Sequence, residues 1–336
     1  MKKVGKNSVV FDNVFLWSSG NTASVKEHNG PLGAYIDYCF PDLYCDKKTW
    51  EDAEMNLLRK ALEISLSKGN LKVDDIGITI GGDLNNQIAV TSYLMQEYDV
   101  PFIGVYAACS TATLSLINGS MIVDGGYDGY VACLTSSHNS TSERQFRYPT
   151  EYGIKRTPSV TSTVTGAGVG ILSNRQTKIK ITKATLGKVI NSTLKDASDM
   201  GRAMAPAAAS TLKQHFDDFS LNENDYDLIV TGDLSSYGSK VFLDILKGLG
   251  INLGNKYQDS GLMLYDIKNQ DVVAGGSGCA CISVVMYGYL SYLLKTKKLK
   301  KILVIATGSL LNPIMTFQGK EIPGIAHAVA LEVCDE

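Results

Sequence analysis

Short apolar runs alternate with amphipathic stretches along most of the chain. Apolar side chains recur at the spacing of one helical face in residues 50–69, which predicts a helix. They are Trp50, Ala53, Leu57, Ala61 and Ile64. The apolar runs 76–80, 102–106 and 130–134 are short and predict buried strands, with a helix at 111–123 between two of them. This alternation predicts an α/β fold with a mainly parallel sheet and helices on its faces.

The same pattern occurs a second time in the C-terminal part of the chain. Residues 227–234 resemble 76–84, and both runs end in Gly-Asp-Leu. Cys109 and Cys279 each stand at the start of an apolar helix, and a strand ending in Thr follows 26 positions after Cys109 and 28 positions after Cys279. Such a repeat indicates two copies of one βαβ-type unit packed together. We therefore expect two halves, residues 1–180 and 181–336, with a helix at 205–219 leading into the second.

Composition and charge exclude several classes of function. The 336 residues carry 32 basic and 34 acidic side chains, a formal net charge of −2, so we expect no nucleic-acid partner. The dense basic run 297–301 is better interpreted as a solvated helix end than as an anionic-lipid patch. No apolar run reaches the ~20 residues of a membrane span, and no signal-peptide core follows the N-terminus. We expect a cytosolic chain, or one docked on a membrane through a partner.

The seven cysteines are odd in number and show no zinc-type CxxC pair, which favours free thiols and no metal site. Cys109 is the first chemical candidate, because it follows a predicted strand and begins a helix. Unpaired N–H groups and the helix dipole there favour a thiolate or a bound oxyanion. The alternative, that Cys109 is simply a small residue suited to a tight turn, stays open. On either interpretation we expect Cys109 to line a small-molecule pocket.

His138 and two arginines are the next candidates. His138 follows the strand that ends near Thr135, and sites in parallel sheets lie at the carboxyl ends of strands. Arg144 and Arg147 have the side chain that binds a carboxylate bidentately. The alternatives are a surface-loop histidine and arginines that pair with nearby glutamates. The glycine-rich run 166–170 lies within a strand pattern, so we interpret it as close packing of strands and not as a nucleotide loop.

Several segments together resemble the thiolase superfamily of condensing enzymes and, within it, a family of stage V sporulation proteins of spore-forming Firmicutes. The resemblance covers nearly the whole chain. The segments that carry it are 106–111 (YAACST), 135–139 (TSSHN), 144–153 (RQFRYPTEYG), 199–201 with 204–209 (DMG and MAPAAA) and 274–281 (AGGSGCAC).

The resemblance implies an α/β, thiolase-like fold with five alternating layers (αβαβα) built from two pseudo-symmetric halves. It also implies binding of dipicolinic acid, or of its calcium complex, for uptake into developing spores, with release on germination as a further expectation. The implied partners are other proteins of the same sporulation operon at the spore inner membrane, and the implied assembly is a homodimer. No cofactor is implied beyond this ligand and its calcium.

Condensing enzymes pair their cysteine with a histidine and an asparagine or second histidine from the second half. At the corresponding places this chain has 231–233 (TGD) and 276–278 (GSG), with no histidine near either. A neutral thiol without a base is a weak nucleophile, so we expect a non-catalytic member in which Cys109 is a vestigial nucleophile. The residues expected to bind ligand are Cys109, Ser137, His138, Arg144, Arg147 and Ser277.

Two alternatives stay open at this point. One is a residual acyl-transfer enzyme that uses Cys109, and the other is a scaffold that docks membrane partners. Asp83 and Asp233, at two loop ends, are weak candidates for facing calcium.

Overall fold

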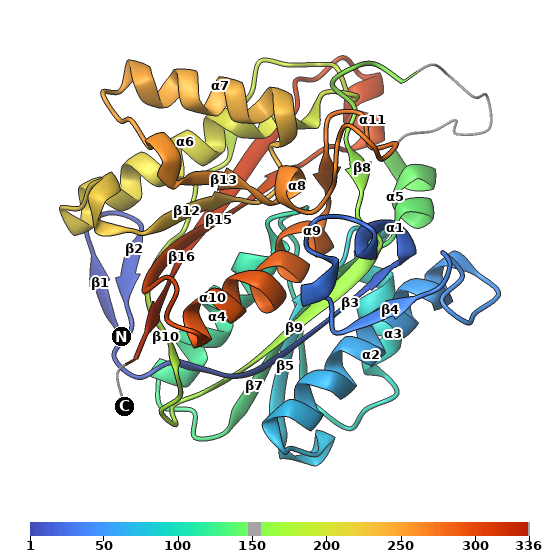
Figure 1. The fold of residues 1–336 in the computed structure, drawn as a ribbon, viewed down its shortest axis with the longest axis vertical. Coiled ribbons are helices and arrows are strands. Elements are labelled where there is room, and N and C mark those ends of the chain that lie inside the picture. The colour runs from blue at the N-terminus through green and yellow to red at the C-terminus, as the bar shows by residue number, and fades with distance from the viewer. Residues whose placement is uncertain (147–155, 335–336) are drawn as a thin grey trace.

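The computed structural model describes residues 1–146 and 156–334, and it shows a mixed α/β fold with two large groups of strands (Figure 1). The first group comprises β3 (Phe15–Ser24), β5 (Ile76–Gly82), β6 (Phe102–Gly104), β7 (Tyr130–Ser137) and β9 (Gly166–Ser173). The second comprises β10 (Ile179–Thr185), β12 (Leu228–Thr231), β13 (Tyr257–Asp259), β15 (Lys301–Ser309) and β16 (Pro323–Val333).

Both groups have the same strand order. The first runs β6-β5-β7-β9-β3 and the second runs β13-β12-β15-β16-β10. Within each group only β9 or β16 runs antiparallel to its neighbours. Lys180 of β10 pairs with Phe15 of β3, and this contact joins the two groups edge to edge. The boundary expected at residue 180 therefore falls just inside the first strand of the second group.

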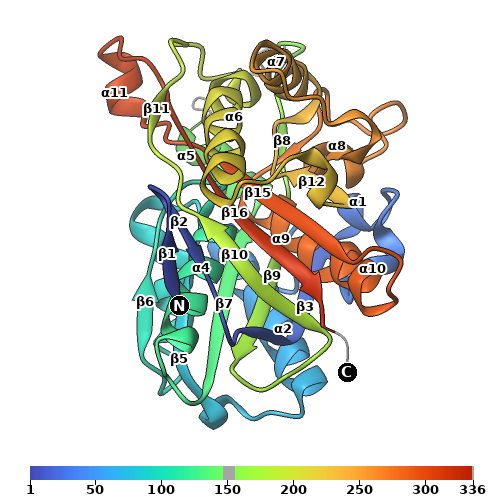
Figure 2. The same cartoon turned by 90° about the vertical axis from the view of Figure 1, so that its left-hand side faces the viewer.

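Helices form three layers around these strands (Figures 1 and 2). The outer helices are α2 (Trp50–Gly69) and α3 (Ala89–Met95) over the first group, and α6 (Met200–Phe219) and α7 (Ser235–Gly248) over the second. Between the two groups lie α4 (Thr111–Asp124), α9 (Cys279–Val285) and α10 (Ser291–Lys295). Because α4 carries no charged residue before Asp124, it can be buried between two sheets. The predicted α/β fold with five alternating layers is confirmed.

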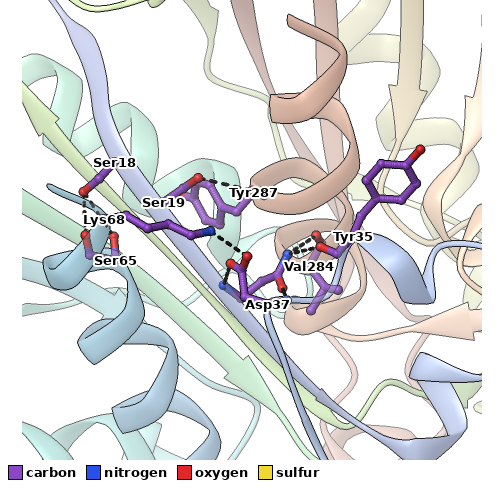
Figure 3. Close-up of polar contacts among 9 residues, drawn as sticks. Ser18, Ser19, Tyr35, Asp37, Ser65, Lys68, Val284 and Tyr287 are labelled. Carbon is purple, nitrogen blue, oxygen red and sulfur yellow. Dashed lines mark hydrogen bonds and ion pairs between the residues drawn. The ribbon is translucent and has the colours of Figure 1, made fainter. Parts of the chain in front are cut away.

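A π-helical turn, Met286–Leu290, separates α9 from α10. Two side chains of β3 donate hydrogen bonds to backbone carbonyl oxygens of this helical region. Asn21 Nδ2 donates to Val284 O at 3.2 Å, and Ser19 Oγ donates to Tyr287 O at 3.2 Å. Insertion of side chains into the helical hydrogen-bond ladder is a common cause of such irregular turns. Figure 3 shows these hydrogen bonds between the central helix and β3.

The glycine-rich run within β9 packs against this central helix. A Cβ atom on Gly168 would lie 2.7 Å from Ser283 Cβ, and one on Gly170 would lie 2.4 Å from the Tyr287 ring. The glycines therefore permit a helix to approach the strand closely. The sequence correctly indicated close packing here, but the partner is a helix and not another strand.

The remaining elements are short, apart from the eight-residue helix α5. They are β1 (Lys2–Val4), β2 (Ser8–Val10), α1 (Val25–His28), β4 (Tyr38–Phe40), α5 (Asn139–Phe146), β8 (Ser162–Thr163), β11 (Ile190–Asn191), α8 (Ser260–Met263), β14 (Gly276–Ser277) and α11 (Pro313–Phe317). The helix predicted at 205–219 begins earlier, at Met200, because the Asp199 side chain accepts from the Arg202 N–H and caps its first turn. In the two described ranges, no helix is both long and apolar enough to cross a bilayer.

Candidate functional site

A pocket opens where α4 and α9 begin, at the carboxyl ends of strands from both halves of the chain. The space that it encloses is small, about 20 Å³, and the rest of it is open to solvent. Ligand sites of α/β folds are commonly found at this end of the strands. The lining residues are Leu84, Tyr106, Ala108, Cys109, Met200, Ser277, Ser309 and Leu311.

The turn that carries Cys109 is held by hydrogen bonds on both sides. Ala108 has a left-handed backbone with φ of 48°. The Thr111 hydroxyl donates to Ala108 O at 2.6 Å and accepts from the Ala107 N–H at 3.0 Å. Ser110 Oγ donates to Ala306 O of β15 at 2.9 Å, which ties the turn to the second half. The thiol of Cys109 is therefore held in a fixed place on the pocket wall.

Asp233, which follows β12, faces the Cys109 thiol from the second half. Its carboxylate accepts from the Gly278 N–H at 3.0 Å and from the Thr307 hydroxyl at 2.5 Å. Burial raises the pKa of Asp233 to about 7. Burial, and then the Asp233 charge, raise the pKa of the Cys109 thiol well above its ordinary value. Cys109 is thus a neutral thiol near pH 7.

Cys279 occupies the equivalent position in the second half and meets Cys109 inside the fold. Cys109, Cys279 and Leu84 form one small buried apolar cluster. Cys279 Sγ donates to Ala108 O at 3.2 Å, and burial raises the pKa of this thiol as well. The starts of α4 and α9, which the sequence repeat made equivalent, are thus in contact. Neither thiol is ionised and ready to act as a nucleophile.

The four histidines of the chain all lie in its described part, and none has a hydrogen bond to Cys109 there. His138 Nε2 lies 2.7 Å from Leu43 O, its ring packs against Trp50, and burial lowers its pKa. The others are His28 at the end of α1, His215 between Thr185 and Tyr226, and His327, which accepts from the Gly187 N–H.

Of the predicted ligand-binding residues, the structure brings Cys109 and Ser277 together in the pocket. Ser277 Oγ accepts from Thr161 Oγ1 at 3.0 Å, which leaves the Ser277 hydroxyl proton free to be donated. Ser137 lies behind this wall, where its hydroxyl donates to Val164 O at 2.8 Å and accepts from the Ala280 N–H at 3.2 Å. Ser137 therefore holds the start of α9 in place.

The other predicted residues lie away from the pocket lining. His138 packs against α2, as described above. Arg144, on α5, forms an ion pair with Glu51 of α2. Its observed partner thus comes from another helix, whereas the sequence pointed to glutamates within the same segment. Arg147 lies outside the described residues.

Apart from Ser277, sequence reasoning missed the pocket wall that the second half supplies. Ser309, at the end of β15, lines the pocket and is only 6% exposed, and its hydroxyl has no hydrogen-bond partner among the described residues. The internal repeat contains a signal for it. Because Thr307 aligns with Thr135, Ser309 aligns with Ser137, which the sequence did single out.

A second group of buried acids lies behind the pocket, next to Leu84. Asp83 accepts from Thr91 N–H and Oγ1 at 2.8 and 2.7 Å and from the Asn85 N–H at 2.8 Å. Burial raises the pKa of Asp83, and it raises the pKa of Glu54 on α2 to about 8. In the described ranges no three His, Cys, Asp or Glu side chains are grouped to hold a metal ion, so no calcium site is marked at Asp83 or Asp233 there.

Comparison with known proteins gave both sequence relatives and structural relatives. The profile of the family described as stage V sporulation protein AD (SpoVAD) matches residues 5–332. Stage V sporulation protein AD of Bacillus subtilis (strain 168) is 46% identical over 333 residues, which cover 99% of this chain and 98% of that protein.

The structural relatives are crystal structures of OleA from Xanthomonas campestris. A variant bound with cerulenin has a TM-score of 0.62 at 14% identity, covering 96% of this chain and 98% of that one. A structure obtained by soaking with cerulenin has a TM-score of 0.61 at 14% identity, covering 96% and 98%. At such low identity these likenesses show the fold alone.

Proposed function

The chain belongs to the stage V sporulation protein AD family, and from this premise we propose that it binds dipicolinic acid, free or as its calcium complex, in the pocket beside Cys109. Binding would serve uptake of the ligand into developing spores and its release on germination. The proposal extends to a homodimer that works with other proteins of the same operon at the spore inner membrane. The observation that carries it is the buried hydroxyl of Ser309, which has no partner among the described residues and belongs to a pocket built by both halves.

The chemistry of the pocket suits a flat pyridine ring with two carboxylates. Leu84, Met200 and Leu311 offer apolar walls for the ring. The hydroxyls of Tyr106, Ser277 and Ser309 are donors that a carboxylate or ring nitrogen can accept from. Among the described residues, the pocket lining includes no Lys, Arg or His. The side chains that do line the pocket therefore offer a carboxylate only neutral hydrogen-bond donors.

We propose further that the protein is not an enzyme. A Cys nucleophile needs a base or a lowered pKa, and Cys109 instead faces a carboxylate that stabilises its protonated form. Asp233, which offers only acceptors when ionised, cannot donate to a developing oxyanion as a histidine or an asparagine would. These features support binding without bond formation.

Replacement of Ser309 with alanine is expected to weaken dipicolinate binding about ten- to a hundredfold, since a hydrogen bond to a charged acceptor contributes about 1.5–3 kcal/mol. Isothermal titration calorimetry with dipicolinate, with and without calcium, measures this. Ser142→Ala is the matched control, because Ser142 also has a buried hydroxyl with no partner in the described part of the chain but lies on α5, outside the pocket lining. Folded wild-type protein that gives no heat with either form of the ligand would refute the proposal.

The second candidate is residual acyl transfer, favoured by the position of Cys109 directly before α4. We expect no acylated Cys109 after incubation with acyl-coenzyme A at pH 7.5, because burial and the Asp233 charge keep the thiol neutral and none of the described residues supplies a histidine hydrogen-bonded to it. Intact-protein mass spectrometry detects the adduct, and Cys109→Ser supplies the background. A stable mass increase on the wild type that Cys109→Ser abolishes would favour the enzyme instead.

A further inference from the structure

A buried carboxyl group, that of Asp233, lies directly behind the lining of the pocket. Asp233 is 1% exposed, and its carboxylate accepts from the Gly278 N–H at 3.0 Å and from the Thr307 hydroxyl at 2.5 Å. It also faces the thiol of the lining residue Cys109, and Gly278 directly follows the lining residue Ser277. Only the atoms of the pocket wall therefore separate the Asp233 carboxylate from a molecule in the pocket.

The surroundings of Asp233 do not compensate its charge. In the described part of the chain Asp233 forms no ion pair, so no basic side chain is in contact with its carboxylate. On α6, which packs against α7, Asp199 pairs with Arg202, and β15 presents the uncharged Thr307. The titratable groups around Asp233 are Cys109 before α4, Cys279 and Cys281 on α9, and Asp259 with the neighbouring Tyr257 on β13.

These titratable groups favour the protonated form of Asp233. The thiols and the Tyr257 phenol stay neutral near pH 7, because burial raises their pKa values. Asp259 carries a charge near neutral pH, and that charge opposes ionisation of Asp233. Burial is the main cause that raises the pKa of Asp233 to about 7, so neutralising this group near pH 7 costs little free energy.

An anion in the pocket must interact with this carboxylate. The pocket lining supplies no basic side chain from the described residues, and like charges repel more strongly across a protein wall than across water. A bound carboxylate therefore favours protonation of Asp233. Because such coupling is reciprocal, protonation of Asp233 strengthens binding of the anion by the same factor.

We propose that the pocket binds its anionic ligand together with one proton, which Asp233 takes up from the solvent. The inference rests on the proposed function, because it requires a carboxylate ligand in this pocket. The Thr307 hydroxyl donates to the ionised carboxylate, and it can rotate to accept from the protonated one. No other bond needs to change when the proton is taken up.

Isothermal titration calorimetry with dipicolinate in calcium-free buffer, between pH 6 and pH 8.5, tests the proposal. Both carboxylates of the ligand stay ionised over this range, so a pH effect arises in the protein. The dissociation constant should rise about tenfold or more from pH 6 to pH 8.5, and by at most about tenfold per pH unit. Titrations at pH 7.5 in phosphate and in Tris, which differ in ionisation enthalpy, should show uptake of up to about one proton per ligand.

Two variants and a control assign the proton to Asp233. Asp233→Asn should take up no proton, and its affinity should not depend on pH. Thr307→Val removes a donor to the ionised carboxylate, so the pH at which binding weakens should move upward. Glu54→Gln is the matched control, because Glu54 also has a raised pKa but lies outside the pocket lining, and it should retain the proton uptake of the wild type.

The possible outcomes separate this inference from the proposed function. Binding by the wild type without proton uptake would overturn the inference and leave the proposed function intact. Uptake that Asp233→Asn retains, or a pH profile that Thr307→Val leaves unshifted, would overturn it in the same way. Absence of binding at every pH would refute the proposed function, and the inference with it.

Discussion

Replacing Glu54 with glutamine is expected to remove part of the loss of stability that buried carboxyl groups with raised pKa values, Glu54 and Asp233 among them, cause as pH rises from about 4.5 to about 8. Glu54 is fully buried, and its folded pKa of about 8 lies above the ordinary value of 4.5. Between these values the unfolded chain releases a proton that the folded chain retains. The free energy of unfolding therefore falls with pH, by up to about 1.4 kcal/mol per pH unit, and levels off above the folded pKa.

Glutamine suits this site because it retains the shape and the neutral charge of the protonated acid. Asn85 and Thr141 can still donate to its oxygen, as they do to Glu54 Oε2 at 3.0 and 2.7 Å. The Ser136 hydroxyl, which donates to Oε1 at 3.0 Å, can rotate and accept from the amide instead.

Urea unfolding followed by tryptophan fluorescence between pH 5 and pH 9 measures the effect. Glu63→Gln, on an exposed part of the same helix, is the matched control and should leave the pH profile of the wild type unchanged. If Glu54→Gln and the wild type lose stability in parallel over this range, Glu54 is not the group that titrates.

Replacing Gly308 with alanine is expected to destabilise the protein by about 1–3 kcal/mol and to displace the Cys109 turn. Gly308 lies on β15, and a Cβ atom there would stand 2.3 Å from Ala107 O and 3.2 Å from the Ser110 N. Both of these atoms belong to backbone in the fixed turn before α4, so the overlap cannot be relieved by a side-chain rotation. The turn must move, and the pocket wall moves with it.

Thermal unfolding gives the change in stability, and calorimetry with dipicolinate gives the change in the pocket, where we expect binding to be lost. Gly248→Ala on α7 is the control, because nothing lies within 4 Å of a Cβ atom there and the substitution should be neutral or slightly stabilising. A Gly308→Ala protein as stable as the wild type, with an unmoved Cys109 turn in its crystal structure, would show that this close approach is not required.

Much of the fold could be predicted from local patterns. The helix predicted at 50–69 is α2, and the strand predicted at 76–80 is β5, extended by two glycines. The repeated Gly-Asp-Leu and the paired cysteines correctly indicated equivalent places in the two halves. These predictions succeeded because periodicity and turn residues act within one element, where sequence spacing determines which side chains share a face.

The site was harder to predict, because it depends on contacts between distant segments. His138 stands at the end of the expected strand, but its ring is engaged by Leu43, which comes from an irregular stretch with no periodic signal. Met200 reaches the pocket only because α6 begins five residues before the predicted start. The sequence showed Asp233 at the place where condensing enzymes have a histidine. Its contact with the Cys109 thiol, however, follows from the packing of the two halves.

The repeat also places equivalent residues in different environments in the two halves. Ser137 and Ser309 occupy equivalent strand ends, but Ser137 is hydrogen-bonded to Val164 and Ala280, whereas Ser309 faces the pocket without a partner among the described residues. The equivalent residue in one half is thus part of the structural framework, and in the other half it lines the pocket.

The pairing of the N-terminal hairpin has a consequence for biosynthesis. The strand β2 pairs with β10, and Ser8 bonds Thr185 across 177 positions of the chain. At the ~5–20 residues per second of translation, β2 leaves the ribosome roughly 10–35 seconds before its partner strand exists. During that interval Val9 and Val10 can pair only with β1, so β2 completes its place in the sheet only after the second half has emerged.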